Sequence, residues 1–237
     1  MFRFLLAAVL AAGAGISPAQ TTQTATFDVY IGGFRAGVLA MSAIETDRQY
    51  SVAGKLQSSG LLRMIREVGY DARSTGRITA QGFVPTRYQE TANTGERISR
   101  AVMEYVNGVP QLKSYDPPQA RRPRDVDPAT QAGTLDPMTS IYSLLRDVPR
   151  DEVCTLNVFM FDGRRRSQVV TGSPERDGQD IDCAGEYRRV AGFSDSQMKD
   201  RTTFPFTLTY SHAADGSFRV TRVVLQTLYG KAVLNRR

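Results

Sequence analysis

Few side chains in this sequence have the types that metal binding or nucleophilic catalysis would need. The 237 residues include one histidine, His212, and two cysteines, Cys154 and Cys183. A zinc site or a Ser-His-Asp triad needs imidazole together with further ligands or partners. His212 stands beside a predicted turn, where an exposed surface position is expected. The sequence therefore predicts neither a transition-metal site nor a triad.

Carboxylates are numerous enough to supply the paired acids of a hydrolase. They stand mainly at turns, caps and polar faces, as Asp47, Asp136, Asp162 and Asp215 do. No glycine-rich dinucleotide fingerprint and no phosphate loop follows a predicted strand. We therefore expect no enzymatic activity, no cofactor and no metal.

The two cysteines favour a disulfide, because the chain carries an export signal and such bonds persist in oxidising compartments. Cys154 and Cys183 lack the CxxC spacing of a redox-active pair; the alternative is two separate buried thiols. If 154–161, 164–171 and 181–193 form a flat meander, the cysteines lie two strands apart, roughly 9.5 Å. That exceeds disulfide reach. Either Cys154 precedes its strand and the chain crosses under the middle strand 164–171, or the middle strand is short near the cysteines.

The first nineteen residues are typical of a secretory signal. Arg3 supplies a positive start, 4–16 form an apolar run, and Ser17-Pro18-Ala19 resembles a cleavage site. Thirteen apolar residues are too few to span a bilayer of roughly 30 Å as a helix. We expect a cleaved signal peptide over 1–19 rather than an uncleaved anchor, no integral membrane segment after cleavage, and a protein of the periplasm or the extracellular space.

The net charge of +6 suggests anionic partners at first sight. The arginines are spread along the chain, and the one dense run, Arg164-Arg165-Arg166, follows a turn and is interpreted as a solvated hairpin. No basic and aromatic patch is evident, so a nucleic-acid partner is not expected.

Alternating apolar and polar residues predict strands along most of the remaining chain. The Asn107-Gly108 pair between two such segments is a strong hairpin signal, because both residues accept positive φ. The predicted strands are 27–31, 34–44, 50–57, 70–79, 86–92, 98–106, 109–115, 154–161, 164–171, 181–193, 204–211 and 218–229.

Three segments depart from this pattern. The short apolar segment 61–66 predicts a brief helix across a sheet. Residues 116–135 contain four prolines and almost no apolar side chains, which indicates a flexible exposed loop; a linker is the simple interpretation, and a lid or partner-binding arm the functional one. Asp136-Pro137 predicts a helix start through 146, with Asp as N-cap and Pro at the first helical position.

These elements predict one mainly β domain over 20–237. A dozen strands and two short helices do not form βαβ units. They favour a large curved antiparallel sheet, open or half-barrel, with one or two short helices packed on it and one disulfide.

Four stretches resemble the bacterial exported family called domain of unknown function 3108. They are FDVYIGGFRAG (27–37), DPMTS (136–140), FDGRRR (161–166) and CAGEYRRVAGF (183–193). The resemblance covers nearly the whole chain after residue 19 and implies a Gram-negative periplasmic protein with a curved antiparallel sheet. That architecture is broadly similar to the carriers that ferry lipoproteins across the periplasm. The family brings no catalytic residues to transfer.

Surplus apolar surface favours a periplasmic, non-enzymatic carrier for a lipid or acyl chain. The alternative is a scaffolding factor of the cell envelope that binds protein partners by strand edges or by 116–135. The candidate apolar ligand face comprises Leu61, Leu62, Met64, Ile65, Phe204, Phe206, Leu208 and Tyr210. Simple packing of these residues against the two helices is the competing interpretation.

Overall fold

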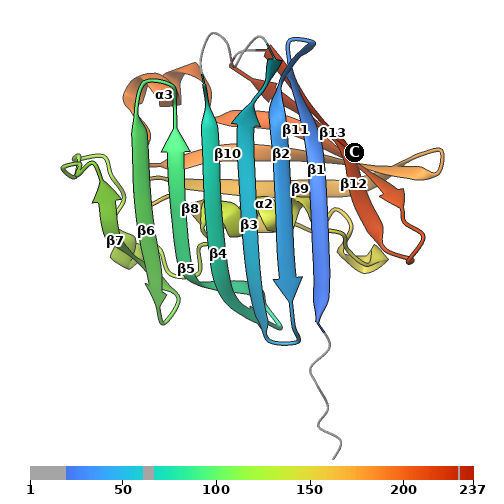
Figure 1. Cartoon of the computed structure of the whole chain (residues 1–237), viewed down its shortest axis with the longest axis horizontal. Coiled ribbons are helices and arrows are strands. Elements are labelled where there is room, and N and C mark those ends of the chain that lie inside the picture. The colour runs from blue at the N-terminus through green and yellow to red at the C-terminus, as the bar shows by residue number, and fades with distance from the viewer. Residues whose placement is uncertain (1–19, 61–66, 229) are drawn as a thin grey trace, which may run out of the picture.

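A computed structural model describes residues 20–60, 67–228 and 230–237, and most of them lie in one antiparallel sheet (Figure 1). The strands are β1 (Thr21–Ile31), β2 (Phe34–Glu45), β3 (Gln49–Ser58), β4 (Gly69–Thr79), β5 (Gly82–Asn93), β6 (Ile98–Val106), β7 (Val109–Asp116), β8 (Asn157–Phe161), β9 (Arg166–Asp177), β10 (Asp180–Ala191), β11 (Thr203–His212), β12 (Phe218–Thr227) and β13 (Gly230–Arg236). The helices are α2 (Pro137–Leu145) and α3 (Asp195–Asp200), with 3-10 turns η1 (Pro128–Thr130) and η2 (Arg150–Glu152). The mainly β class predicted from the sequence is confirmed.

The strand order is β7-β6-β5-β4-β3-β2-β1-β13-β12-β11-β10-β9-β8. Each strand pairs with its sequence neighbour except at two places. The chain ends meet where β1 pairs with β13, and β7 and β8 are the two edge strands. The sheet is therefore open, as predicted, and consists of a first half, β1–β7, and a second half, β8–β13.

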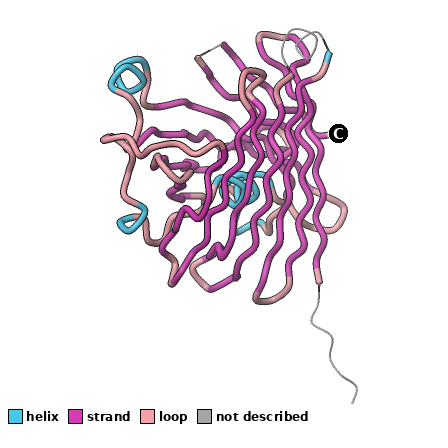
Figure 2. Tube along the Cα trace, turned by 60° about the vertical axis from the view of Figure 1, so that its left-hand side comes forward, coloured by secondary structure: helices cyan, strands magenta, loops and turns pink. Residues whose placement is uncertain are grey.

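The two halves face each other across helix α2. Figures 1 and 2 show β8–β10 running behind and across β2–β6, with α2 between the two layers. Asp136 caps the helix through its side chain, and Pro137 occupies the first turn, as the sequence predicts. On either side of the helix the chain bridges to the second half, Leu135 to Met160 and Val148 to Phe218. The helix is thereby fixed inside the curved sheet.

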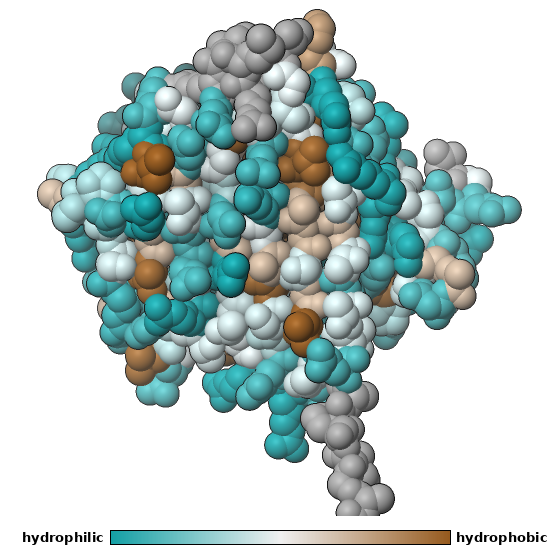
Figure 3. Space-filling model, viewed as in Figure 1, coloured by the Kyte–Doolittle hydropathy of each residue, from teal (hydrophilic) through white to brown (hydrophobic). Residues whose placement is uncertain are grey.

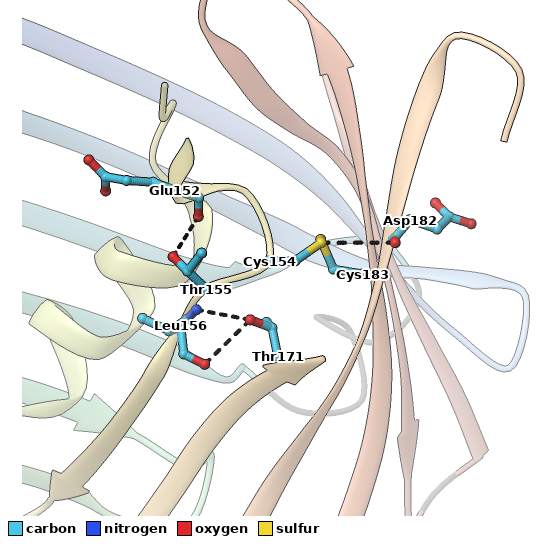
Figure 4. The surroundings of a disulfide bond; sticks show 7 residues. All are labelled: Glu152, Cys154, Thr155, Leu156, Thr171, Asp182 and Cys183. Atoms are coloured by element: carbon cyan, nitrogen blue, oxygen red, sulfur yellow. Dashed lines mark hydrogen bonds between the residues drawn. A yellow bond between two sulfur atoms is a disulfide. The ribbon is translucent and has the colours of Figure 1, made fainter. Parts of the chain in front are cut away.

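The predicted disulfide is confirmed, with 5.4 Å between the Cα atoms of Cys154 and Cys183. The prediction that the strand begins at residue 154 is wrong, because β8 begins at Asn157. Cys154 lies in the loop before the strand and has φ of 62°. Figure 4 shows this loop carrying Cys154 to Cys183 in β10. The bond thus reaches past β9, which is the first of the two arrangements considered.

Two elements were not predicted from the sequence. Residues 218–229 were expected to be the last strand, yet β12 ends at Thr227 and β13 follows. Helix α3 lies between the predicted strands 181–193 and 204–211, in a segment for which no element was predicted, and Ser194 and Gln197 form a capping box at its start. The predicted helix 61–66 lies outside the described residues.

The connection between β7 and α2 contains η1 and has specific anchors. The Arg164 guanidinium donates to the carbonyls of Gln119 and Ala120 and to the Asp125 carboxylate. Gln131 and Thr134 are buried. The flexibility of this connection stays a prediction. In the described part of the chain, no helix has the length and apolar character needed to cross a membrane.

Candidate functional site

An apolar cavity of about 480 Å³ lies between the two halves of the sheet beside α2. It is called the central cavity below. Strands β2–β5 form one wall, α2 lies along it, and β8–β12 form the other wall. Its lining includes Leu39, Leu56 and Ala72 from the first half, Ile141 and Leu144 from α2, and Val169, Phe206 and Leu225 from the second half.

The hollow exists because α2 does not fill the space between the walls. Met138, Tyr142 and Leu145 recur at helical spacing and are buried on the core-facing side of α2. Ile141 has the same helical spacing but is 38% exposed, and its side chain lines the central cavity. An apolar side chain of an enclosed helix is therefore left without a protein neighbour on one side, which favours an apolar ligand there.

One glycine sets how closely α2 approaches the first half of the sheet. A Cβ at Gly54 would lie 2.5 Å from the sulfur of Met138. Only glycine permits this close approach without displacing the methionine. Gly54 and Met138 both line the central cavity, so this contact defines one of its corners.

The tyrosine hydroxyls around the cavity are all directed to protein partners. Tyr70 and Tyr88 both donate to one oxygen of Glu90. Burial, followed by the Glu90 carboxylate, raises the pKa of both phenols, so they remain protonated donors. The Tyr187 hydroxyl lies 3.0 Å from the Ser167 hydroxyl. The cavity walls therefore present ring faces rather than unsatisfied polar groups.

A buried polar network lies at the start of α2. The Asp136 carboxylate accepts from the Thr139 backbone N–H at 2.9 Å, and from the hydroxyls of Thr139 and Ser74, each at 2.7 Å. The Tyr50 hydroxyl lies 2.8 Å from Thr139 Oγ1, and because the Thr139 hydroxyl donates its proton to Asp136, Tyr50 is the donor of this bond. Burial raises the pKa of Asp136, and the bond from the Thr139 backbone opposes that shift.

This network contains residue types that are found in acid-base sites, but its side chains are not accessible to a substrate. Asp136 and Thr139 have no exposed surface, and Ser74 is 1% exposed. The sole histidine is elsewhere, with its ring against Phe218 at 5.2 Å between centroids. The network therefore fixes α2 to β3 and β4 and offers no surface to a substrate.

Residues 26–221 match the family described as Protein of unknown function (DUF3108). The chain belongs to this family. No curated protein has a matching sequence. A solved structure with a similar fold is the crystal structure of a β-barrel-like protein of domain of unknown function DUF1849 from Brucella abortus. It is 13% identical, the match covers 90% of this chain and 94% of that one, and the TM-score is 0.50. At this identity the likeness concerns the fold alone.

In this DUF3108 protein, the four predicted ligand-site residues that belong to β11 lie on the interior face of the sheet. Phe204, Phe206, Leu208 and Tyr210 are all buried, and of these Phe206 lines the central cavity. Leu208 belongs to the packed core with no exposed surface. Phe204 packs on Tyr187 at 5.9 Å between ring centroids, and Tyr210 lines a separate recess near Cys154.

The remaining predicted site residues lie outside the described part of the DUF3108 chain. They are Leu61, Leu62, Met64 and Ile65. The cavity residues that were not predicted from the sequence come from β2–β5, from α2 and from β8–β10 and β12. On α2, Ile141 and Leu144 extend the apolar face beyond the buried side chains, and the width of that face was the available sequence signal.

Within residues 20–60, 67–228 and 230–237, no cluster of three or more His, Cys, Asp or Glu side chains could hold a metal ion.

Proposed function

We propose that this protein is a non-enzymatic binding or carrier protein that holds an apolar ligand, a lipid or acyl chain, in the central cavity. The observation that carries the proposal is the cavity itself. Its volume of about 480 Å³ falls within the roughly 300–1,000 Å³ of small-molecule sites. Ile141 and Leu144 on the helix and Phe206 on the opposite wall would contact the ligand.

The distribution of apolar surface supports an interior site. Figure 3 shows the outward face of the first half of the sheet as mostly polar, with separate apolar side chains among polar ones. Scattered apolar residues of this kind are ordinary on protein surfaces. On the first half of the sheet, the continuous apolar surface is therefore the one that faces inward, toward α2.

We also place this activity in the periplasm. The disulfide supports an oxidising compartment, and the export signal proposed for 1–19 supports secretion. The scaffolding alternative has less support, because one free edge is already occupied. Leu135 exchanges backbone hydrogen bonds with Phe159 and Phe161 along β8, so another chain would have to displace it before adding a strand there.

Native mass spectrometry of the protein purified from a periplasm, followed by organic extraction, tests the proposal directly. We expect a lipid-sized adduct that is released by the extraction. A mass equal to the chain alone, together with no binding of the neutral probe N-phenyl-1-naphthylamine, would refute it.

Ile141→Gln is expected to weaken binding of that probe by roughly tenfold or more. An amide buried against an apolar ligand without a partner costs about 1–3 kcal/mol. The folded apo protein should lose little stability, because Ile141 is 38% exposed to the cavity. Fluorescence titration measures the affinity.

Ile44→Gln is the matched control. Ile44 is 44% exposed on β2, and its neighbours Ala43 and Met41 show that it points away from the buried face. The same chemical change at similar exposure should leave probe binding unaltered. Equal losses in both variants would place the probe on the outer surface rather than in the cavity.

A further inference from the structure

A second recess of about 410 Å³ brings together five arginines from distant parts of the chain. Arg97 lies in the turn between β5 and β6, and Arg122 and Arg124 lie in the β7–α2 connection. Arg164 and Arg165 lie in the turn between β8 and β9. These five residues define the arginine cleft. The cleft was not predicted from the sequence, because its arginines are far apart in the chain. The interpretation of the run at 164–166 as a solvated hairpin is therefore incomplete, since Arg164 and Arg165 line the cleft.

Acidic groups neutralise only part of this charge. Asp125 is the one acidic residue lining the cleft; it pairs with Arg164 at 2.9 Å, and the two side chains are 5% and 12% exposed. Arg165 pairs with Asp162 at 3.4 Å. Among the residues that the structure describes, the guanidinium groups of the other three arginines form no salt bridge, so the cleft keeps an excess of about three positive charges.

The cleft is built before any ligand arrives. Arg164 fixes the β7–α2 connection through the carbonyls of Gln119 and Ala120 at 3.2 and 3.4 Å. Gly192 has φ of +85°, and a Cβ on it would lie 2.4 Å from the Arg164 carbonyl oxygen, so this close approach requires glycine. A site whose walls are fixed in advance requires little reorganisation to bind an anion.

We propose that the arginine cleft binds a phosphate group. The guanidinium fork matches phosphate oxygens in a bidentate geometry. Arg122 and Arg124 are exposed and line the cleft, and Arg97 lies beside them with its guanidinium donating to the Tyr115 hydroxyl at 3.3 Å.

The phosphate has two conceivable sources, a free phosphate compound or the headgroup of an amphiphile. A layer of side chains lies between the cleft and the central cavity. Arg165 lies 5.5 Å from the centroid of the Phe193 ring, Arg189 lies over both Phe193 and Phe204, and Phe204 packs on Tyr187 in the cavity wall. An amphiphile that extended from the cavity past these rings would place its headgroup toward the arginines. Binding of an amphiphile headgroup rests on the proposed function, whereas binding of a free phosphate compound does not.

The test uses Arg122→Gln/Arg124→Gln in the full chain, with pyrophosphate, dodecyl phosphate and dodecanol as probes. Both arginines are exposed, so the variant should fold normally. Arg73→Gln/Arg77→Gln is the matched control, because these two exposed residues of β4 lose the same charge away from the cleft. Calorimetry measures pyrophosphate binding, and displacement of N-phenyl-1-naphthylamine measures the two dodecyl ligands.

We expect the cleft variant to bind pyrophosphate roughly tenfold more weakly than wild type, while the control is unchanged. If the source is an amphiphile, wild type prefers dodecyl phosphate to dodecanol and the cleft variant loses that preference. Unchanged phosphate binding in the cleft variant, or equal losses in the control, would overturn the proposal. Dodecanol that fails to bind any variant would refute the cavity proposal and leave pyrophosphate as the test of the cleft.

Discussion

Asp136→Ala is expected to lower the free energy of unfolding by roughly 2–4 kcal/mol. The substitution removes the helix N-cap, which is worth about 0.5–2 kcal/mol. It also leaves the buried Ser74 and Thr139 hydroxyls without their shared acceptor, and an unsatisfied buried polar group costs about 1–3 kcal/mol. Urea denaturation measures the change. A loss below about 1 kcal/mol would show that the network does not hold α2 in place.

Asp136→Asn separates the carboxylate's charge from its hydrogen bonds. Asparagine caps helices about as well as aspartate, and the two hydroxyls can rotate to accept from its amide. We therefore expect this variant to stay within about 1 kcal/mol of wild type at neutral pH. A loss as large as that of the alanine variant would mean that the negative charge itself is required.

Comparing wild type with the asparagine variant also predicts how the free energy of unfolding depends on pH. Burial raises the pKa of Asp136 above its ordinary value of 3.8, so the folded state holds this proton more tightly than the unfolded state. The contribution of Asp136 to the free energy of unfolding therefore falls as pH rises from about 3.8 through the raised pKa, and is constant above it. The asparagine variant lacks this contribution, while other titrating groups cancel in the difference. A difference between the two proteins that does not change with pH would contradict the raised pKa.

Much of the fold could be predicted from the sequence because its signals are local. Asp136-Pro137 begins α2 as predicted, and the turn at Asn107 and Gly108 has the positive φ values, 52° and 76°, that the pair favours. The pairing of β1 with β13 could not be predicted in this way. It joins Phe27 to Arg236, and no local pattern encodes a contact between residues so far apart in the chain.

For the candidate sites too, features that depend on local sequence patterns could be predicted and features that depend on long-range contacts could not. Alternation along β11 placed Phe206 on the inner face, which is the property that brings it to the central cavity. Whether an inward side chain meets a neighbour or a hollow depends on the curvature of the sheet, so Leu208 and Phe206 could not be distinguished from sequence. The arginine cleft depends on three turns meeting in space, and the spacing of Arg97 from Arg164 carries no such information.

The disulfide reaches from the loop before β8 to a fully buried position. Cys183 has no exposed surface, and Cys154 is 7% exposed. The bond closes a loop with a sequence separation of 29 residues, which includes β8 and β9. A loop of this length restricts the unfolded chain by roughly 3.5 kcal/mol in the chain-entropy treatment.

Unfolding wild type in the presence of a reductant is therefore expected to lower its free energy of unfolding by roughly 3.5 kcal/mol. Cys154→Ala/Cys183→Ala is the matched control, because it lacks the bond and should give the same denaturation curve with and without reductant. Both proteins are equilibrated at each urea concentration, so that access to the buried sulfurs does not limit the result. Because the bond acts mainly on the unfolded chain, the reduced protein should still bind N-phenyl-1-naphthylamine under native conditions. An unchanged wild-type midpoint in reductant would contradict the stabilising role of the bond, and lost probe binding in a folded, reduced protein would show that the bond also shapes the cavity.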